Sequence, residues 1–305
     1  MELAPGFSRQ SLLTDLGRVA YARGGPEITV ANTPLTTLLF LHGFGGGSSS
    51  YEWSLVYPAF AAHYRVIAPD LIGWGDSEHP RRDYTDLDYL QLLETLISHF
   101  AETGPIVVIA SSLTAGLVIR AAIAIPEKLQ ALILFHPSGL SDFGQDFRDT
   151  WLAQLIATPG LDQVVYRFGI ATEFGIQTFM GQRQFANPEQ ISPAMVKAYL
   201  RSAEMENADC AALAFVRGDL CFDLADYLPT LTTPTFFIWG SEAQLSSLSL
   251  GQELAKLNPQ AIREFITLPN VGITPQLEVP AVTIGLIHRC LGKIEGLVID
   301  IPRHD

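Results

Sequence analysis

Short apolar runs alternate along the chain with amphipathic stretches, and this alternation limits the choice of folds more than any other feature of the sequence. Six runs are mostly continuous in apolar character, as strands buried on both faces of a sheet must be. They cover residues 37–41, 64–68, 106–109, 131–135, 235–239 and 264–267. Two further runs, 10–13 and 19–22, predict an N-terminal hairpin, and a helix is expected over 86–100 with Thr85 as its N-cap. The sequence therefore predicts an α/β fold, with a mostly parallel sheet of about eight strands flanked by helices.

The alternation stops in one long segment, residues 139–232. Several helices are expected there, including 149–157 and 193–206, without a convincing strand among them. A helical insertion after one strand of a parallel sheet lies over the carboxyl ends of the strands, where ligands bind in open α/β sheets. We therefore expect a core formed by residues 1–138 and 233–305, covered by an all-helical lid formed by residues 139–232.

The charge and the cysteines argue against several classes of protein. Nineteen basic residues against 32 acidic ones give a formal charge of −13 at pH 7, so binding to nucleic acid is not expected. Cys210, Cys221 and Cys290 are widely spaced and form no CxxC pair. They predict buried thiols in a reducing compartment, and neither a disulfide framework nor a zinc site. No metal ion or cofactor is expected.

The apolar character of the chain has two interpretations. Only 17% of its residues are charged, against about 25% in an average soluble protein. Either a wide apolar pocket or face meets a lipid-like ligand or a partner, or the core is simply rich in alanine and leucine. We find no secretory signal and no apolar run of the ~18 residues that crossing a bilayer requires. We therefore expect a cytoplasmic protein without a transmembrane segment, with peripheral membrane contact left open.

Two glycine-containing motifs follow the strands predicted over 37–41 and 64–68. Residues 41–47 (LHGFGGG) come first, and their glycines allow backbone N–H groups to turn towards a ligand. Residues 68–77 (APDLIGWGDS) form the next loop, in which Asp70 and Asp76 are expected to hold turns by bonding backbone groups. Both motifs indicate loops at the carboxyl edge of the sheet.

A third and a fourth motif lie further along the chain. Residues 108–116 (VIASSLTAG) run from a strand into a helix, with Ser112 at the turn between them. By itself this pattern is more typical of a serine, Ser111 or Ser112, that caps the helix. The fourth motif has two parts, a strand and loop over 234–243 (PTFFIWGSEA) and a loop over 268–278 (LPNVGITPQLE).

Together and in this order, the four motifs resemble those of the α/β-hydrolase family, in its lidded esterase- and lipase-like branch. The resemblance covers nearly the whole chain, and it implies that Ser112 occupies the position of the nucleophile. It also implies an oxyanion hole formed by the N–H groups of Phe44 and Leu113, in a site to which His42 and Gly43 also belong.

Two substitutions remove groups that this family uses. Ala243 stands at the position of the acid, three residues after Gly240, and Ile273 stands at the position of the histidine, directly after Gly272. A serine hydroxyl attacks an acyl carbon only when an adjacent base takes its proton, and isoleucine cannot do so. Loss of the histidine from a serine protease costs roughly a millionfold in turnover. We therefore expect hydrolysis through a triad to be close to the limit of detection.

His136 is the candidate for a relocated base. It follows the strand predicted over 131–135, from which its side chain would reach the pocket, and Asp142 or Glu242 would orient it. The more common outcome for such a histidine is a bond to the backbone or a place in the pocket wall. The hypothesis predicts close contact between His136 and Ser112.

Three functions stay open on this basis. The first is a non-hydrolysing or very weakly active relative that binds an apolar small molecule or a protein partner. The second is a serine esterase or lipase-like hydrolase of hydrophobic esters that uses His136 as its base. The third is a non-hydrolytic enzyme in which the oxyanion hole stabilises an enolate or a similar anion.

Overall fold

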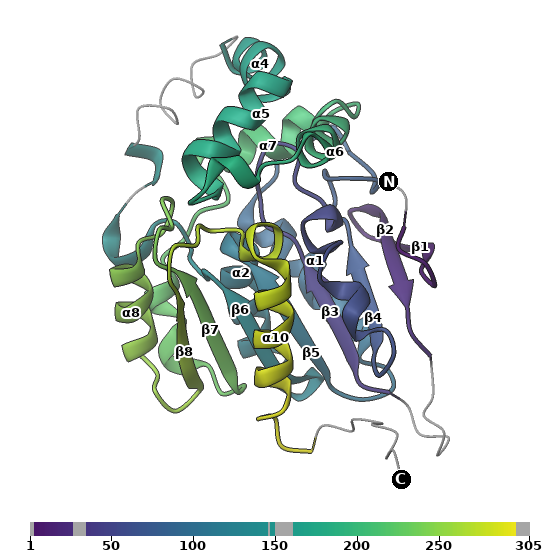
Figure 1. Ribbon diagram of the computed structural model, residues 1–305, viewed down its shortest axis with the longest axis vertical. Coiled ribbons are helices and arrows are strands. Elements are labelled where there is room, and N and C mark those ends of the chain that lie inside the picture. The colour runs from purple at the N-terminus through teal and green to yellow at the C-terminus, as the bar shows by residue number, and fades with distance from the viewer. Residues whose placement is uncertain (1–2, 27–34, 146, 150–160, 297–305) are drawn as a thin grey trace.

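The computed structural model describes residues 3–26, 35–145, 147–149 and 161–296, and its centre is one eight-stranded sheet (Figure 1). The strand order is β1-β2-β4-β3-β5-β6-β7-β8. The strands are β1 (Ser8–Thr14), β2 (Gly17–Gly24), β3 (Thr37–Leu41), β4 (Arg65–Pro69), β5 (Ile106–Ser111), β6 (Leu129–Phe135), β7 (Thr235–Gly240) and β8 (Ile262–Leu268). β2 pairs antiparallel with β1 and β4, and all other pairs are parallel. The predicted α/β fold is therefore confirmed, including the N-terminal hairpin.

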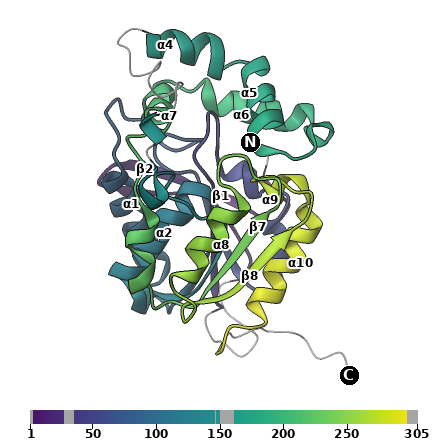
Figure 2. The same ribbon diagram turned by 90° about the vertical axis from the view of Figure 1, so that its left-hand side faces the viewer.

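Helices cover both faces of this sheet (Figure 2). One face carries α1 (Asp86–Phe100), α2 (Ser112–Ala124) and α8 (Leu248–Lys256). The other face carries α10 (Pro280–Leu291), which follows the short helix α9 (Pro275–Glu278), and the 3-10 turns η1 (Ser50–Trp53) and η2 (Tyr57–Phe60). Because β3, β5 and β7 are buried along their whole length, the apolar runs of the sequence form two cores, one on each face.

The helix predicted over 86–100 has the bounds that its sequence indicates. The Thr85 side chain accepts a hydrogen bond from the N–H of Asp88, and the Asp88 carboxylate accepts one from the N–H of Thr85. This capping box satisfies two backbone donors that would otherwise lack partners at the start of the helix. The predicted N-cap is confirmed.

The segment between β6 and β7 forms a helical insertion at one end of the sheet (Figure 1). Its helices include α4 (Leu161–Val165), α5 (Glu173–Phe179), α6 (Pro193–Ala203) and α7 (Ala208–Arg217). The helix predicted over 193–206 is confirmed as α6, whereas residues 150–157 of the other predicted helix lie outside the described residues. Within the described ranges, no helix combines the length and the apolar character that crossing a membrane requires.

Candidate active site

The junction of β5 and α2 places Ser112 on a tight turn. β5 ends at Ser111, and Ser112 is the first residue of α2, with a φ of +56° that is uncommon for a residue with a side chain. Capping does not account for this arrangement, because the Ser111 side chain makes no capping hydrogen bond. The turn brings Ser112 beside the N–H of Leu113 at the positive end of a helix. Such a geometry can present a hydroxyl group and a hydrogen-bond donor to neighbouring atoms of the same ligand group.

The glycine-rich loop after β3 lies against this turn, and His42 holds it in place. The His42 ring is buried, with Nδ1 2.7 Å from the carbonyl oxygen of Gly43 and Nε2 accepting from the N–H of Leu71 at 2.9 Å. Both ring nitrogens are used in these contacts, so His42 supports the loop and offers no free base. Among the described residues, no acceptor is bonded to the N–H of Phe44 or Leu113. That these two donors bind an oxyanion stays a prediction of the resemblance.

A small cavity adjoins Ser112, with a volume of about 20 Å³. Residues of the core and of the insertion both contribute to its wall, among them Gly43, Phe44, Ile273, Phe179 and Gln184. A space of this size can hold about one water molecule, whereas pockets for small ligands usually measure about 300–1,000 Å³. A larger ligand can therefore reach Ser112 only if part of the wall moves.

Ile273, at the position of the missing histidine, lies in the wall of this cavity. Its side chain is buried, and its N–H donates to the carbonyl oxygen of Gln184 at 2.8 Å. The fold thus brings the substituted position to Ser112, with a branched aliphatic side chain in place of an imidazole. An isoleucine contributes neither a proton acceptor nor a hydrogen bond to the serine.

The position of the missing acid contributes no carboxylate either. Ala243 is half-buried after β7, outside the wall of the Ser112 cavity. The neighbouring Glu242 is exposed, and its carboxylate accepts a hydrogen bond from Ser241 Oγ at 3.0 Å. These contacts place the Glu242 side chain at the surface, where it cannot orient a base at Ser112.

His136 is not positioned to act as a base for Ser112. Its ring is fully buried against Trp239, and its Nε2 accepts a hydrogen bond from the N–H of Gly240 at 2.7 Å. Burial lowers the pKa of this imidazole to about 3. Among the described residues, no hydrogen bond joins His136 to Ser112, and His136 is absent from the wall of the cavity. The interpretation of His136 as a relocated base is therefore corrected, because its lone pair serves a peptide N–H.

Asp142, considered as an orienting group for His136, has a structural task. Its carboxylate accepts hydrogen bonds from Ser138 Oγ at 2.5 Å and from the N–H groups of Gly139 and Leu224. Burial raises the pKa of this carboxyl group, against the opposing effect of these hydrogen bonds. Because its donors come from both ends of the insertion, Asp142 fixes the points at which the insertion leaves and rejoins the core.

Glu52 is the residue of this site that sequence reasoning missed. It lies in η1, is 1% exposed and contributes to the wall of the Ser112 cavity. Oε2 accepts from the N–H of Gly43 at 3.0 Å, and Oε1 accepts from the Tyr199 hydroxyl, in helix α6, at 3.1 Å. The only signal in the sequence is an acidic residue between two aromatic ones, Tyr51 and Trp53, shortly after the glycine-rich loop.

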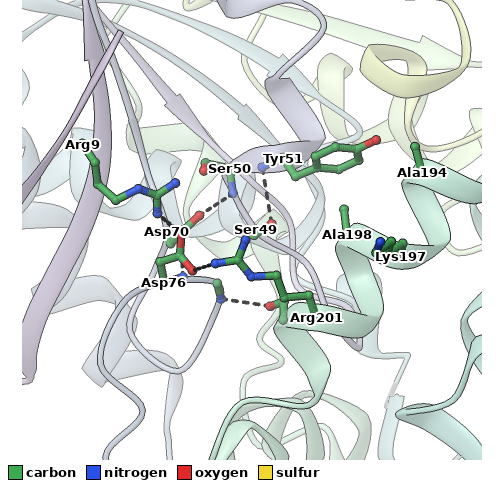
Figure 3. Close-up of a pocket in the computed structure, with 12 residues that line it drawn as sticks. Arg9, Ser49, Ser50, Tyr51, Asp70, Asp76, Ala194, Lys197, Ala198 and Arg201 are labelled. Carbon is green, nitrogen blue, oxygen red and sulfur yellow. Dashed lines mark hydrogen bonds and ion pairs between the residues drawn. The ribbon is translucent and has the colours of Figure 1, made fainter. Parts of the chain in front are cut away.

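A second and larger cavity, of about 450 Å³, lies between the core and helix α6 and does not include Ser112 (Figure 3). Arg9 of β1 and Arg201 of α6 both pair with the carboxylate of Asp76, Arg201 at 3.1 Å. Tyr51 extends towards Ala194 on the other side of this cavity. The pairs join the N-terminal strand, the loop after β4 and the insertion.

Comparison with known proteins bears on the fold and the family of the chain. The model of the alpha/beta hydrolase family matches residues 38–285. An uncharacterized protein of Mycobacterium tuberculosis (strain ATCC 25618 / H37Rv) is 32% identical over 104 residues, which is 34% of this chain and 30% of that protein. The 2-hydroxymuconate semialdehyde hydrolase of Pseudomonas sp. (strain CF600) is 33% identical over 110 residues, 34% of this chain and 37% of that enzyme. The chain thus matches about a third of the length of these curated relatives.

A solved structure shares the fold over nearly the whole chain. It is a serine hydrolase involved in carbazole degradation, with a TM-score of 0.74 and 18% sequence identity, and the match covers 94% of this chain and 99% of that one. At this level of identity the likeness concerns the fold alone.

Proposed function

This chain belongs to the alpha/beta hydrolase family, and on that premise we propose that it does not carry out the serine–histidine–acid reaction at an ordinary enzymatic rate. It keeps Ser112 and the N–H groups of Phe44 and Leu113 as a site for a carbonyl or anionic group. The observation that carries the proposal is the buried side chain of Ile273 in the wall of the Ser112 cavity. Without an imidazole there, the hydroxyl stays protonated and reacts slowly.

The helical insertion, residues 139–232, acts as a lid in this proposal. Phe179 and Gln184 of the insertion contribute to the wall beside Ser112, and the remaining volume of about 20 Å³ admits about one water molecule. A ligand must therefore displace part of the insertion before it reaches the serine.

The partner in this proposal is an apolar small molecule beneath the insertion or a protein that contacts its outer surface. Two phenylalanines of the insertion support a contact at that surface, since Phe168 is 75% and Phe174 is 80% exposed. Large aromatic side chains at such exposure are typical of interaction surfaces when they occur together. Both kinds of partner are compatible with slow ester hydrolysis.

The experiment that tests the proposal is turnover of p-nitrophenyl acetate and p-nitrophenyl octanoate by the purified chain. We expect rates far below those of a triad esterase measured in parallel, by roughly the millionfold that loss of the histidine costs. The S112A variant is the control for hydrolysis at other surface groups. Turnover at the rate of the triad esterase, abolished in S112A, would refute the proposal.

A further inference from the structure

Glu52 is a buried acidic side chain without a cationic partner. It is 1% exposed, and no described Lys, Arg or His nitrogen lies within 4 Å of its carboxylate. Buried carboxylates are costly unless they are paired or hydrogen-bonded. The two hydrogen bonds from Gly43 and Tyr199 satisfy only part of its capacity, because a carboxylate accepts up to about four.

The Glu52 carboxylate and Ser112 both lie close to Gly43. A Cβ atom built on Gly43 would lie 3.4 Å from Ser112 Cβ and 3.7 Å from Glu52 Oε2. Both residues contribute to the wall of the cavity of about 20 Å³, which is large enough for one water molecule. A single water molecule in this space would therefore lie close to both side chains.

Three further polar atoms in the same wall support an ordered water molecule. Ser48 Oγ, Ser111 Oγ and Gln184 Oε1 are buried, and none of them has a hydrogen-bond partner in the protein. Buried polar atoms without protein partners usually bond to ordered water. The concentration of such atoms around one small cavity distinguishes this place from the apolar cores above and below the sheet.

We propose that Glu52 accepts the proton of Ser112 through one water molecule in their shared cavity, in place of the absent imidazole. The inference rests on the proposed function, because it assumes that no imidazole serves the serine. With an alkyl fluorophosphonate as substrate, Ser112 Oγ forms a bond to phosphorus, the P–F bond breaks and fluoride leaves. The serine proton passes to the water molecule, which gives one of its own protons to Glu52. The N–H groups of Phe44 and Leu113 bind the phosphoryl oxygen during the attack.

The test is the rate at which an alkyl fluorophosphonate labels Ser112, followed by intact-protein mass spectrometry. The E52Q variant keeps the size of the side chain and an oxygen for the Gly43 N–H, but it cannot take a proton. We expect E52Q to label at least ~100-fold more slowly than the unchanged chain, in line with the usual contribution of a general base. D86N is the control, because the Asp86 carboxylate pairs with Arg120 and lies outside the cavity wall and the insertion, and its labelling rate should stay unchanged.

A second variant separates proton transfer from support of the loop. In E52A the side chain is removed, and we expect added sodium formate to restore labelling in proportion to its concentration, because formate supplies the missing carboxylate. A purely structural role of Glu52 predicts no such rescue. This measurement also replaces the first one if E52Q does not fold.

The outcomes distinguish this inference from the proposed function. Equal labelling of E52Q and the unchanged chain, or no labelling of the unchanged chain, overturns the role of Glu52 and leaves the proposed function intact. Labelling as fast as that of a triad esterase and lost in H136Q overturns the proposed function instead. Slow labelling that needs Glu52 and is unaffected by H136Q supports both.

Discussion

Glu278 Oε2 accepts a hydrogen bond from the N–H of Gly272 at 2.7 Å, and this contact fixes the loop that carries Ile273. The other carboxylate oxygen, Oε1, accepts from the N–H groups of Ala186 and Asn187, at 3.0 Å each. One buried side chain thus holds the loop in register with the helical insertion. The loop at the histidine position is therefore ordered by contacts that do not depend on a histidine.

Restoration of the two missing side chains should restore ester hydrolysis. The double variant A243D/I273H places an imidazole on a loop that Glu278 already holds beside Ser112. We expect hydrolysis of p-nitrophenyl acetate to rise at least ~10²-fold over the unchanged chain, a small part of what a complete triad contributes. The triple variant that also carries S112A should lose this gain. No increase in the double variant would mean that the geometry of the site has also diverged.

Removal of the Glu278 carboxylate should destabilise the chain. E278A leaves three backbone N–H groups without their acceptor, and hydrogen bonds to charged groups are worth about 1.5–3 kcal/mol each. We expect the free energy of unfolding to fall by at least ~3 kcal/mol in urea titrations. E278Q retains one carbonyl oxygen as acceptor, so its free energy of unfolding should lie between those of the unchanged chain and E278A. Equal midpoints for all three proteins would contradict this account of the loop.

The stability of the chain should depend on pH through His136. Its pKa is about 3 in the folded chain because burial disfavours the charged ring, against an ordinary value of 6.5. Below pH 6.5 the unfolded chain therefore binds a proton that the folded chain does not, so stability falls as the pH drops from 6.5 towards 3. The contribution of one such group is about 1.4 kcal/mol per pH unit.

The H136Q variant isolates this contribution. Glutamine offers an oxygen to the N–H of Gly240 and does not titrate, so the variant should lose the part of the pH dependence that comes from His136. Asp142, whose pKa burial raises, titrates in both proteins and cancels in the comparison. Chemical denaturation at pH 4, 5, 6 and 7 measures the two slopes. Identical slopes would show that the ring titrates in the folded chain as it does in the unfolded chain.

The proposed place of an apolar ligand can be tested with two phenylalanines of one helix. Phe179 contributes to the cavity beside Ser112, whereas Phe174, also in α5, is 80% exposed. If the ligand lies beneath the insertion, F179A should bind the apolar dye Nile red several-fold more tightly, because the cavity widens. F174A should bind it like the unchanged chain. Weaker binding in F174A, with no effect of F179A, would instead place the apolar contact on the outer surface of the insertion.

Local sequence determined much of this protein. Each buried strand is a continuous apolar run, and the capping box at Thr85 and Asp88 involves residues only three positions apart. The turn at Ser112 and the substitutions Ala243 and Ile273 are likewise visible in short motifs. Such features depend on neighbours along the chain, so periodicity and motif spacing are sufficient to predict them.

Tertiary structure alone decided how the site is composed. Glu52 reaches the Ser112 cavity with its carboxylate bonded to Tyr199, a residue 147 positions away, and no local pattern encodes such a contact. The orientation of His136 was decided in the same way, because its partner Gly240 belongs to the neighbouring strand, 104 positions later in the chain. Hydrogen bonds between distant segments depend on how the sheet, the loops and the insertion pack together, and that packing exists only in the folded chain.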